Sequence, residues 1–292
     1  MLPGGTHQAK SSVPPSSPLA DTPRRIEPAQ HTPPAAHAAP NAARTVSSVR
    51  ERVYPEARFG GFTRRDGTVP FLGRVHALMP EQGTLLDIGC GRGQQAEDRC
   101  RYRRGLHDLR GPGRTVIGID VDPDAATNPF IDEFRHVENV ERWPIDDASI
   151  DLAVSISVLE HVPDPAAFFD EVARVLKPGG VICLKTPNKR SYPSMAARII
   201  PNRLHARVVA KAQGNRKGED VFPTVYRCNT AGALRRQCGR RSLEHVVYPI
   251  ESEPNYLQFS PVLYRVFAKL HPLIPPPFRS TLILLARKNA PA

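Results

Sequence analysis

The chain has 292 residues, of which 40% are hydrophobic, so it can bury one large α/β core. It contains no run of about 18 apolar residues, so no membrane-spanning helix is expected, and its five cysteines form no CxxC pair, which argues against a disulfide framework. The net charge of +11 is confined to residues 189–241, which hold 13 basic residues and two acidic ones. Since the whole chain has 40 Lys and Arg and 29 Asp and Glu, the rest of it holds 27 basic and 27 acidic residues. We therefore expect a reduced, cytoplasmic protein with one basic region.

Residues 1–48 form the first distinct segment of the chain. They include nine prolines and no aromatic residue, so they bury too little apolar surface to offset the entropy lost on ordering. We predict a disordered Pro/Ala-rich tail over residues 1–48 and a single domain over residues 49–292.

From about Tyr54 the sequence alternates between short apolar runs and helical patterns, which is typical of a βα fold. Short apolar runs of this kind form buried parallel strands. We predict strands at Thr84–Gly89, Thr115–Asp120, Arg135–Asn139, Ile150–Ser157, Val181–Thr186, Leu243–Ile250 and Thr281–Arg287.

The clearest helix is predicted over Pro165–Lys177. Asp164 is a suitable N-cap, Pro165 suits the first helical position, and the glycines after Lys177 stop the helix. Its apolar side chains form one stripe, which predicts that the helix covers the sheet.

The strongest chemical signal is the sequence LDIGCGRG, in which an apolar strand runs directly into a G-x-G-x-G turn. Glycines suit such a turn because it is tight and because a ligand must approach its backbone closely. We expect a helix after the turn to direct its N-terminal amides at the ligand. Asp120, at the end of the next strand, is placed to accept hydrogen bonds from a ribose diol.

The blocks DIGCGRG, GIDVDP and LEHVPDPAAFFDEVARVLKPGG resemble those of class I S-adenosylmethionine-dependent methyltransferases, in particular the small-molecule branch with the quinone-biosynthesis enzymes (type 11 domain). The similarity spans about Leu72 to Arg287. It implies a Rossmann-like, doubly wound α/β sheet of seven strands, whose antiparallel last strand is inserted beside its neighbour, and S-adenosylmethionine as cofactor. It also implies site roles: the methionine moiety for Gly89, Gly91 and Gly93, loop orientation for Asp87, and the ribose for Asp120.

Two positions depart from the pattern of that family. Asn139 stands where relatives often have an acid that accepts from the adenine amino group, and an Asn carbonyl can accept the same hydrogen bond. Ser157 stands where the quinone O-methyltransferases have the first carboxylate of an E-x-x-E-H motif. We expect Asn139, its neighbour Val140, and Ser157 to contact the cofactor, and we predict no metal because Glu160 and His161 alone are too few ligands.

His161 is the candidate general base, with Glu160 beside it. The alternative is that this pair only holds the start of the next helix, and the sequence does not decide between the two roles. A strong base is not essential, because alignment of the acceptor with a reactive sulfonium supplies much of the rate.

The basic segment 189–229 follows the fifth strand and is too long for a plain loop. We interpret it as a helical cap insertion over the site, or as a pair of solvated amphipathic helices. Its charge favours an anionic acceptor such as a phosphorylated sugar or a lipid-linked glycan. Candidate acceptor contacts are Tyr192, His205, Tyr226 and Arg227.

An amphipathic pattern also occupies Tyr256–Leu270. It fits a weak interfacial membrane contact or a cover on the site, although packing on the protein's own core is the commoner use of such a helix.

The predicted function is transfer of a methyl group from S-adenosylmethionine to the oxygen or nitrogen of a small-molecule or lipid- or glycan-linked acceptor. One alternative is an RNA methyltransferase that uses the basic cap, although no appended RNA-binding motif is present. A second is a nicotinamide-dependent Rossmann enzyme, against which the glycine spacing and the lack of a Tyr-x-x-x-Lys pair argue. A third is a binding protein with a degenerate site, against which the intact glycines and Asp120 argue.

Overall fold

The computed structural model describes residues 48–199 and 223–290. The chain divides into Met1–Thr45 and Val46–Ala292, and the described residues belong to the second unit. The predicted tail, except for Ser48, therefore lies outside the described residues, as do His205 and the middle of the predicted cap.

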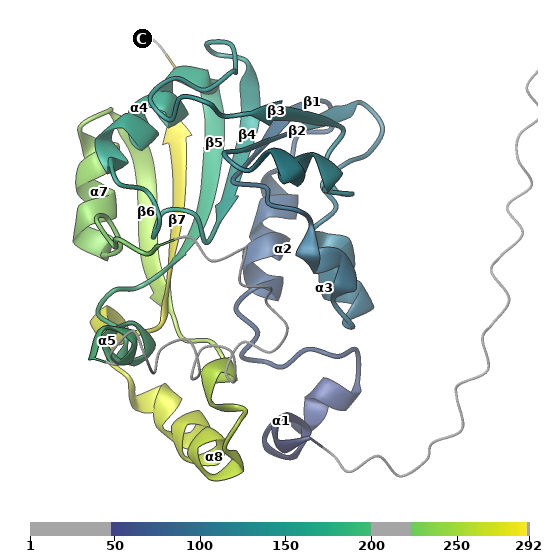
Figure 1. Ribbon diagram of the computed structural model, residues 1–292, viewed down its shortest axis with the longest axis vertical. Coiled ribbons are helices and arrows are strands. Elements are labelled where there is room, and N and C mark those ends of the chain that lie inside the picture. The colour runs from purple at the N-terminus through teal and green to yellow at the C-terminus, as the bar shows by residue number, and fades with distance from the viewer. Residues whose placement is uncertain (1–47, 200–222, 291–292) are drawn as a thin grey trace, which may run out of the picture. The chain divides into compact units, whose positions relative to one another are not determined.

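Seven strands form one sheet in the order β3-β2-β1-β4-β5-β7-β6. Strands β1 to β5 pair in parallel, whereas β7 pairs antiparallel with both β5 and β6. The prediction of an antiparallel last strand inserted beside its neighbour is confirmed (Figure 1). The strands are β1 (Gly83–Ile88), β2 (Arg114–Asp120), β3 (Glu133–His136), β4 (Ile150–Ile156), β5 (Leu176–Pro187), β6 (Leu243–Ile250) and β7 (Thr281–Lys288).

The prediction for β3 was wrong by two to three residues. The strand ends at His136 instead of Asn139, because the side chain of Asn139 accepts a hydrogen bond from the Glu141 amide at 2.9 Å. This local turn takes the chain out of the ladder.

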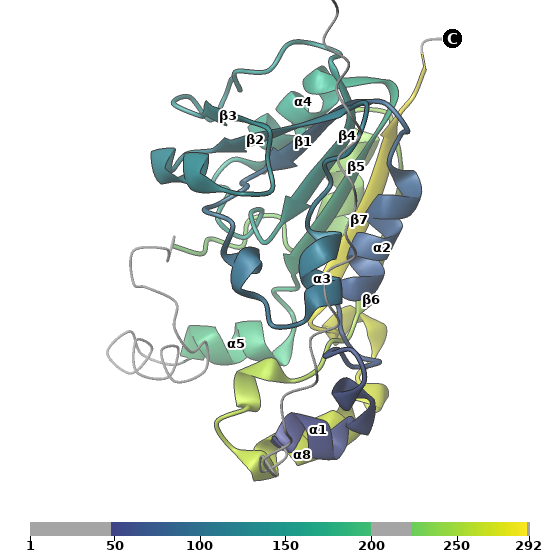
Figure 2. The ribbon, with the colours of Figure 1, turned by 90° about the vertical axis from the view of Figure 1, so that its right-hand side faces the viewer.

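Helices cover both faces of the sheet (Figures 1 and 2). Helix α2 and the end of α3 pack on one face, and α4 and α7 pack on the other. The helices are α1 (Val49–Val53), α2 (Val69–Leu78), α3 (Arg101–Leu106), α4 (Pro165–Val175), α5 (Tyr192–Ile199), α7 (Ala231–Gly239) and α8 (Pro261–Leu270).

Helix α4 begins where it was predicted to begin. One side-chain oxygen of Asp164 accepts hydrogen bonds from the amides of Ala166 and Ala167 at 2.8 and 3.1 Å, which satisfies two donors of the first turn. The helix ends at Val175, two residues before the predicted Lys177, because the chain enters β5 at Leu176.

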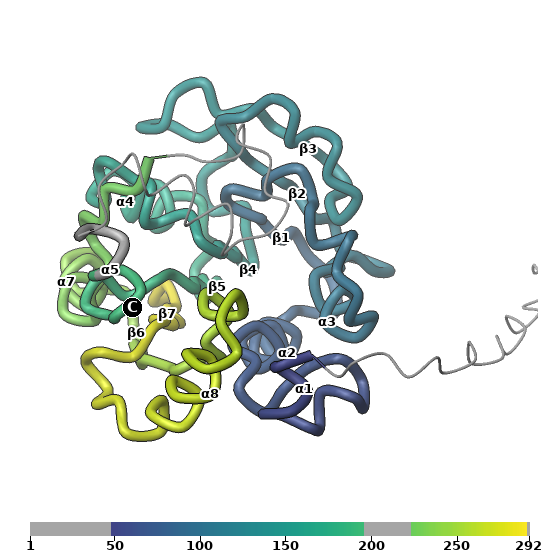
Figure 3. Tube along the Cα trace, turned by 60° about the horizontal axis from the view of Figure 1, so that its bottom comes forward, coloured from purple at the N-terminus to yellow at the C-terminus, as the bar shows by residue number. Residues whose placement is uncertain are grey.

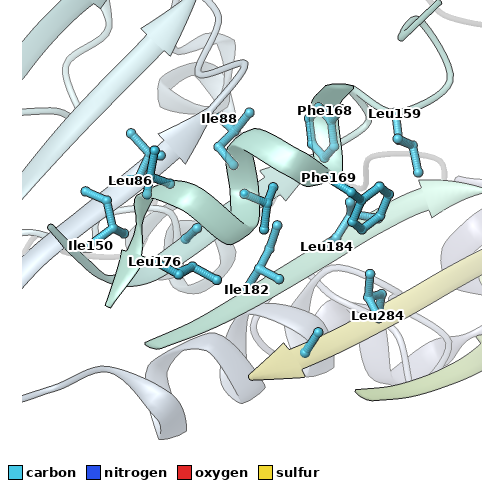
Figure 4. Close-up of a cluster of buried hydrophobic side chains, with 14 of the residues drawn as sticks. Leu86, Ile88, Ile150, Leu159, Phe168, Phe169, Leu176, Ile182, Leu184 and Leu284 are labelled. Carbon is cyan, nitrogen blue, oxygen red and sulfur yellow. The ribbon is translucent and has the colours of Figure 1, made fainter. Parts of the chain in front are cut away.

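The larger core cluster lies between α4, α7 and the sheet. Phe169 of α4 is fully buried and belongs to one cluster with Leu86 of β1, Leu184 of β5 and Leu284 of β7 (Figure 4). Because successive strand residues face opposite sides, the remaining positions of the same strands face α2. Burial on both faces holds the strands rigidly, and their carboxyl ends consequently carry the site loops at fixed positions.

A third cluster joins the start of the described chain to its late part. Tyr54 and Tyr264 pack edge to face with ring centroids 6.4 Å apart, and Arg50 pairs with the buried carboxylate of Glu253 at 2.8 Å. These contacts fasten α1 to α8.

Two sequence expectations can be compared directly with this structure. No helix in the ranges 48–199 and 223–290 is long and apolar enough to cross a bilayer. The five cysteines are all free and buried.

Candidate functional site

The carboxyl ends of β1, β2 and β4 meet at one edge of the sheet (Figure 3). The loops that leave these ends carry the glycine turn, Asp120 and Ser157, respectively. In open α/β sheets the ligand crevice lies at this edge, beside the point where the strand order reverses. Here the order reverses between β1 and β4, since β1 and β2 are neighbours and β4 continues on the other side.

The three predicted glycines serve two different purposes. All have positive φ angles of 69°, 57° and 73°, for Gly89, Gly91 and Gly93 in turn. A Cβ on Gly89 would lie 2.3 Å from a methyl of Val158, and one on Gly93 would lie 2.4 Å from Pro129, whereas a Cβ on Gly91 would meet nothing within 4 Å. Gly89 and Gly93 are therefore required for packing, and Gly91 leaves space in which a ligand can approach the backbone.

The turn is held by the end of β2. One carboxylate oxygen of Asp120 accepts a hydrogen bond from the Gly91 amide at 2.9 Å, and the other accepts one from the Asp122 amide at 2.9 Å. The buried Asn128 donates to the Cys90 carbonyl at 2.8 Å. Asn128 was not found from the sequence, because nothing local marks an Asn in a loop as a partner of a turn 38 residues earlier.

The segment after the turn differs from the prediction. Instead of a helix that starts at the glycines, a short 3₁₀ helix spans Gln94–Glu97 and α3 begins only at Arg101. Asp98 ends the short helix, since its carboxylate accepts from the Cys100 amide at 2.9 Å and pairs with Arg103. The amides that face the site therefore come mainly from the turn itself.

Asp87 has a different environment from the one that the family resemblance implies. The amides of Gly89 and Cys90 donate to the Ile119 carbonyl, so within the described residues the turn is held without a hydrogen bond from the Asp87 side chain. Burial and the neighbouring Asp120 carboxylate raise the pKa of Asp87 to about 7. A cation bound beside Asp87 would favour its ionised form.

The predicted adenine side of the site lies beyond β2 and β3. Asn139 and Val140 are exposed, and one lone pair of the Asn139 amide oxygen is used by Glu141. Val121, directly after Asp120, is also an exposed apolar residue. Because β2 and β3 are parallel neighbours, both valines lie at the same edge, where they offer apolar surface to a planar base. Val121 was missed in the sequence, although its place after the ribose acid is a usable signal.

Ser157 directly follows β4, which ends at Ile156 and not at the predicted Ser157, and has a left-handed conformation with φ of 58°. Its amide donates to the Lys185 carbonyl of β5 at 2.9 Å. Such a conformation is unfavourable for a residue with a Cβ and is typical of functional loops. It turns the chain away from the sheet beside the glycine turn.

Glu160 is a buried carboxylate with 4% exposure. It accepts a hydrogen bond from the Thr186 hydroxyl at 3.0 Å, and Asn229 donates to that hydroxyl at 2.6 Å. The Glu160 carbonyl also accepts from the amides of Val225 and Tyr226. These contacts indicate that Glu160 holds the loop after β4 against the chain that returns from the predicted cap.

His161 is half-buried, and its Nδ1 lies 3.1 Å from the Pro223 carbonyl. A carbonyl can only accept, so this contact places the proton on Nδ1 and the basic lone pair on Nε2. The contact with the returning chain suits the role of holding this loop, and the role of general base stays a prediction.

The three described acceptor candidates make different contacts. The backbone of Tyr226 contacts Glu160, and the following Arg227 is exposed. Tyr192 packs on Phe267 of α8 with ring centroids 4.9 Å apart, and its hydroxyl lies 3.1 Å from Nε2 of His271. Tyr192 therefore contributes to the contact between α5 and α8.

Lys185 lies beside the loop after β4, where its carbonyl accepts from the Ser157 amide, and it was not found from the sequence. It extends from β5 on the same face of the sheet as Asp87, and its ammonium donates to the Thr68 hydroxyl at 2.8 Å. Burial lowers the pKa of Lys185 to about 8. A lysine in the otherwise apolar run VICLKT was the available signal.

The middle of the chain matches a known protein family. Residues 86–184 match the family model described as a methyltransferase domain. A probable S-adenosylmethionine-dependent methyltransferase of Mycolicibacterium smegmatis is 35% identical over 113 residues, which are 37% of this chain and 39% of that protein. The ubiquinone biosynthesis O-methyltransferases of Paracidovorax citrulli and Hydrogenovibrio crunogenus are 34% and 30% identical, over 43% and 54% of this chain and 53% and 62% of their own lengths.

The chain thus spans between about two fifths and three fifths of these curated relatives. Among solved structures, a methyltransferase of Haloferax volcanii in complex with its Trm112 activator aligns with a TM-score of 0.48 and 18% identity, over 83% of this chain and 95% of that one.

Proposed function

We propose that this chain transfers the methyl group of S-adenosylmethionine to a negatively charged small-molecule or lipid-linked acceptor, since residues 86–184 match a methyltransferase domain and lie in the parallel part of the sheet. The observation that carries the proposal is the glycine turn. Its backbone is open at Gly91, and Asp120 at the end of the neighbouring strand holds the Gly91 amide at 2.9 Å.

The residues at this edge fit the proposed cofactor. Gly91 offers backbone without a side chain to the methionine moiety, Asp120 offers carboxylate oxygens to the ribose, and Val121 and Val140 offer apolar surface to the adenine. When bound, S-adenosylmethionine supplies a positively charged sulfonium with an electrophilic methyl group. A cation near a carboxylate favours its ionised form. The positive charge of the bound cofactor would therefore favour ionised Asp87, and the Asp87 carboxylate would in turn stabilise that charge.

Acceptor chemistry is assigned to the loop after β4. His161, with the basic lone pair on Nε2, is placed to take the proton that an oxygen or nitrogen acceptor loses. Glu160 acts through position, since its buried carboxylate fastens that loop to Thr186. Lys185 and Arg227 supply positive charge for an anionic acceptor, together with the basic segment 189–229.

Calorimetry with S-adenosylhomocysteine tests the cofactor half of the proposal. Wild-type protein should bind it, and Asp120→Ala should weaken binding by roughly 1–3 kcal/mol, since the ribose loses its acceptor. Binding of NADH with no response to S-adenosylhomocysteine would instead support the nicotinamide-dependent alternative.

A labelling experiment tests the acceptor half. A cell extract incubated with methyl-labelled cofactor and wild-type protein should yield a labelled small molecule or lipid that is absent with Asp120→Ala. The basic region leaves an RNA acceptor as the second candidate. An RNA-binding protein would lose affinity linearly on a plot of log affinity against log salt, with a slope set by the phosphates it neutralises, and its labelled product would be RNA.

A further inference from the structure

Helix α8 presents an apolar face to solvent. Its Tyr264 is fully buried against Tyr54 and Val49, so only one side of the helix contacts the protein core. A separate stripe at helical spacing is between 41% and 66% exposed and consists of Val262, Leu263, Val266 and Leu270. The stripe is therefore a second apolar face, in addition to the one that anchors the helix.

The exposed apolar surface continues on both sides of the helix. We define the α8 surface as this stripe together with the exposed side chains of Tyr256, Phe259, Leu273 and Phe278. Single exposed apolar residues are normal, but a segment in which eight large apolar side chains are exposed marks an interaction surface or a liability for aggregation.

The segment that carries the α8 surface has charge of a single sign. Residues 255–280 contain Arg265, Lys269 and Arg279 and no acid. Arg265 and Lys269 are one turn apart on α8 and border the stripe, because they follow Val262 and Val266, respectively, by three residues. No carboxylate among the described residues lies within 4.0 Å of either cation. An apolar stripe bordered by cations without acids is the pattern of a helix that lies in the surface of an anionic bilayer.

The α8 surface lies on the functional side of the sheet. Helix α8 follows β6, whose carboxyl end is at the same edge as those of β1, β4 and β5, and Figures 1 and 2 both show α8 beyond that edge, close to α5. The ring contact between Phe267 and Tyr192 joins the two helices. A bilayer in contact with α8 would therefore lie on the side from which an acceptor enters.

We propose that the α8 surface docks on an anionic lipid bilayer, with the apolar stripe in the boundary between headgroups and acyl chains and with Arg265 and Lys269 at the headgroup phosphates. The docking itself is independent of catalysis. Its consequence for the acceptor rests on the proposed function: an acceptor with a lipid anchor reaches the site from the bilayer and not from bulk water.

Co-sedimentation of the full chain with vesicles tests the docking. Wild-type protein should bind vesicles that contain phosphatidylglycerol and should bind pure phosphatidylcholine far more weakly, because only the former attract the two cations. The double variant Val262→Ser/Val266→Ser should reduce the apparent affinity at least about tenfold, since two apolar side chains lose their burial. Arg265→Ala/Lys269→Ala should reduce it by about fivefold per charge at low salt, with a smaller effect at high salt.

Matched controls separate docking from general damage. Val246→Ser removes an equally exposed valine on the edge strand β6, and Arg240→Ala removes an exposed cation after α7. Both should leave vesicle binding within twofold of wild type. Far-ultraviolet circular dichroism and S-adenosylhomocysteine affinity should be unchanged in every variant, because all these side chains lie on the surface and outside the cofactor site.

Three outcomes would overturn the docking proposal. The first is that wild-type protein does not bind anionic vesicles, and the second is that Val262→Ser/Val266→Ser binds them as well as wild type does. The third is that wild-type protein binds no lipid but self-associates, and that the double variant abolishes this self-association, which would make the α8 surface a contact between two copies. Failure to bind S-adenosylhomocysteine with vesicle binding intact would instead refute the proposed methyl transfer and leave the docking standing.

Discussion

Asp87→Asn should make the ligand-free protein more stable at neutral and alkaline pH while it weakens cofactor binding. The substitution keeps the shape of the side chain but removes its charge. The physical reason is that Asp87 is ionised at a site where burial and the Asp120 carboxylate oppose ionisation, so its pKa is about 7 instead of 3.8.

The shift sets both the sign and the pH window of the effect. Above about pH 4 the unfolded chain carries Asp87 ionised, while the folded protein keeps it protonated up to about pH 7. Unfolding therefore releases a proton in this interval, and the contribution of Asp87 to stability falls as pH rises through it and is constant above it. Each pKa unit corresponds to 1.36 kcal/mol. Between pH 5 and pH 8, the advantage of Asp87→Asn should grow by about 2 kcal/mol, after allowance for partial solvent contact.

Urea denaturation at pH 5 and pH 8 measures this change. Asp151→Asn is the matched control, because the Asp151 carboxylate accepts from the Thr84 amide at 2.8 Å and pairs with Lys177 at 2.7 Å; it should lose stability at both pH values. Calorimetry in the same buffers should show that S-adenosylmethionine, which carries the sulfonium charge, binds wild type more tightly at pH 8 than at pH 6 and binds Asp87→Asn with constant affinity. The reasoning is refuted if Asp87→Asn is less stable than wild type at pH 8, or if its advantage is the same at pH 5.

Three further predictions concern the turn, the ion pair and the tail. Gly91→Ala should reduce S-adenosylhomocysteine affinity at least tenfold, and its positive φ should cost only about 1–2 kcal/mol of stability. Gly93→Ala should cost more stability, because its new Cβ would lie 2.4 Å from Pro129. Equal losses of stability for the two variants in thermal melts would contradict this. Arg50→Ala should destabilise by about 3–5 kcal/mol, since it leaves the Glu253 carboxylate buried without its guanidinium, and an unchanged denaturation midpoint would show that solvent already screens the pair. Deletion of residues 1–47 should shift the melting temperature and cofactor affinity little, since the α1 N-cap Ser48 is retained; a large drop in either would reveal a structural role for the tail.

Local sequence was sufficient for most of the elements and for the geometry of the glycine turn. Because their apolar runs are buried on both faces, the strands were found within three residues, except that β5 begins at Leu176, five residues before the predicted Val181. Helix α4 begins at Pro165, as predicted, because the Asp164 side chain caps its first turn. Gly89, Gly91 and Gly93 were found for a similar reason: a turn that needs positive φ and close backbone approach admits few other residues.

Tertiary structure decided which contacts those residues make. Asp120 was predicted to bind a ribose, and the fold shows that it also holds the Gly91 amide. Asp87 was expected to orient the turn, but the Ile119 carbonyl and Asp120 hold the turn instead, and the packing raises the pKa of Asp87 to about 7. Asn128 contacts the glycine turn and Lys185 contacts Thr68 across distances in the chain that no local pattern connects.

The two kinds of information differ for a physical reason. Strand burial, capping and turn geometry depend on residues within a few positions of one another, so the sequence by itself determined the α/β class, the order of the strands along the chain and the glycine turn. A pKa, an anchored carboxylate or an exposed helix face depends on which distant segments pack together. The sequence of α8 predicted an amphipathic helix, but only the fold decided that Tyr264 faces the core while Val262, Val266 and Leu270 face solvent, because that choice follows from the contact with Tyr54, more than 200 residues earlier in the chain.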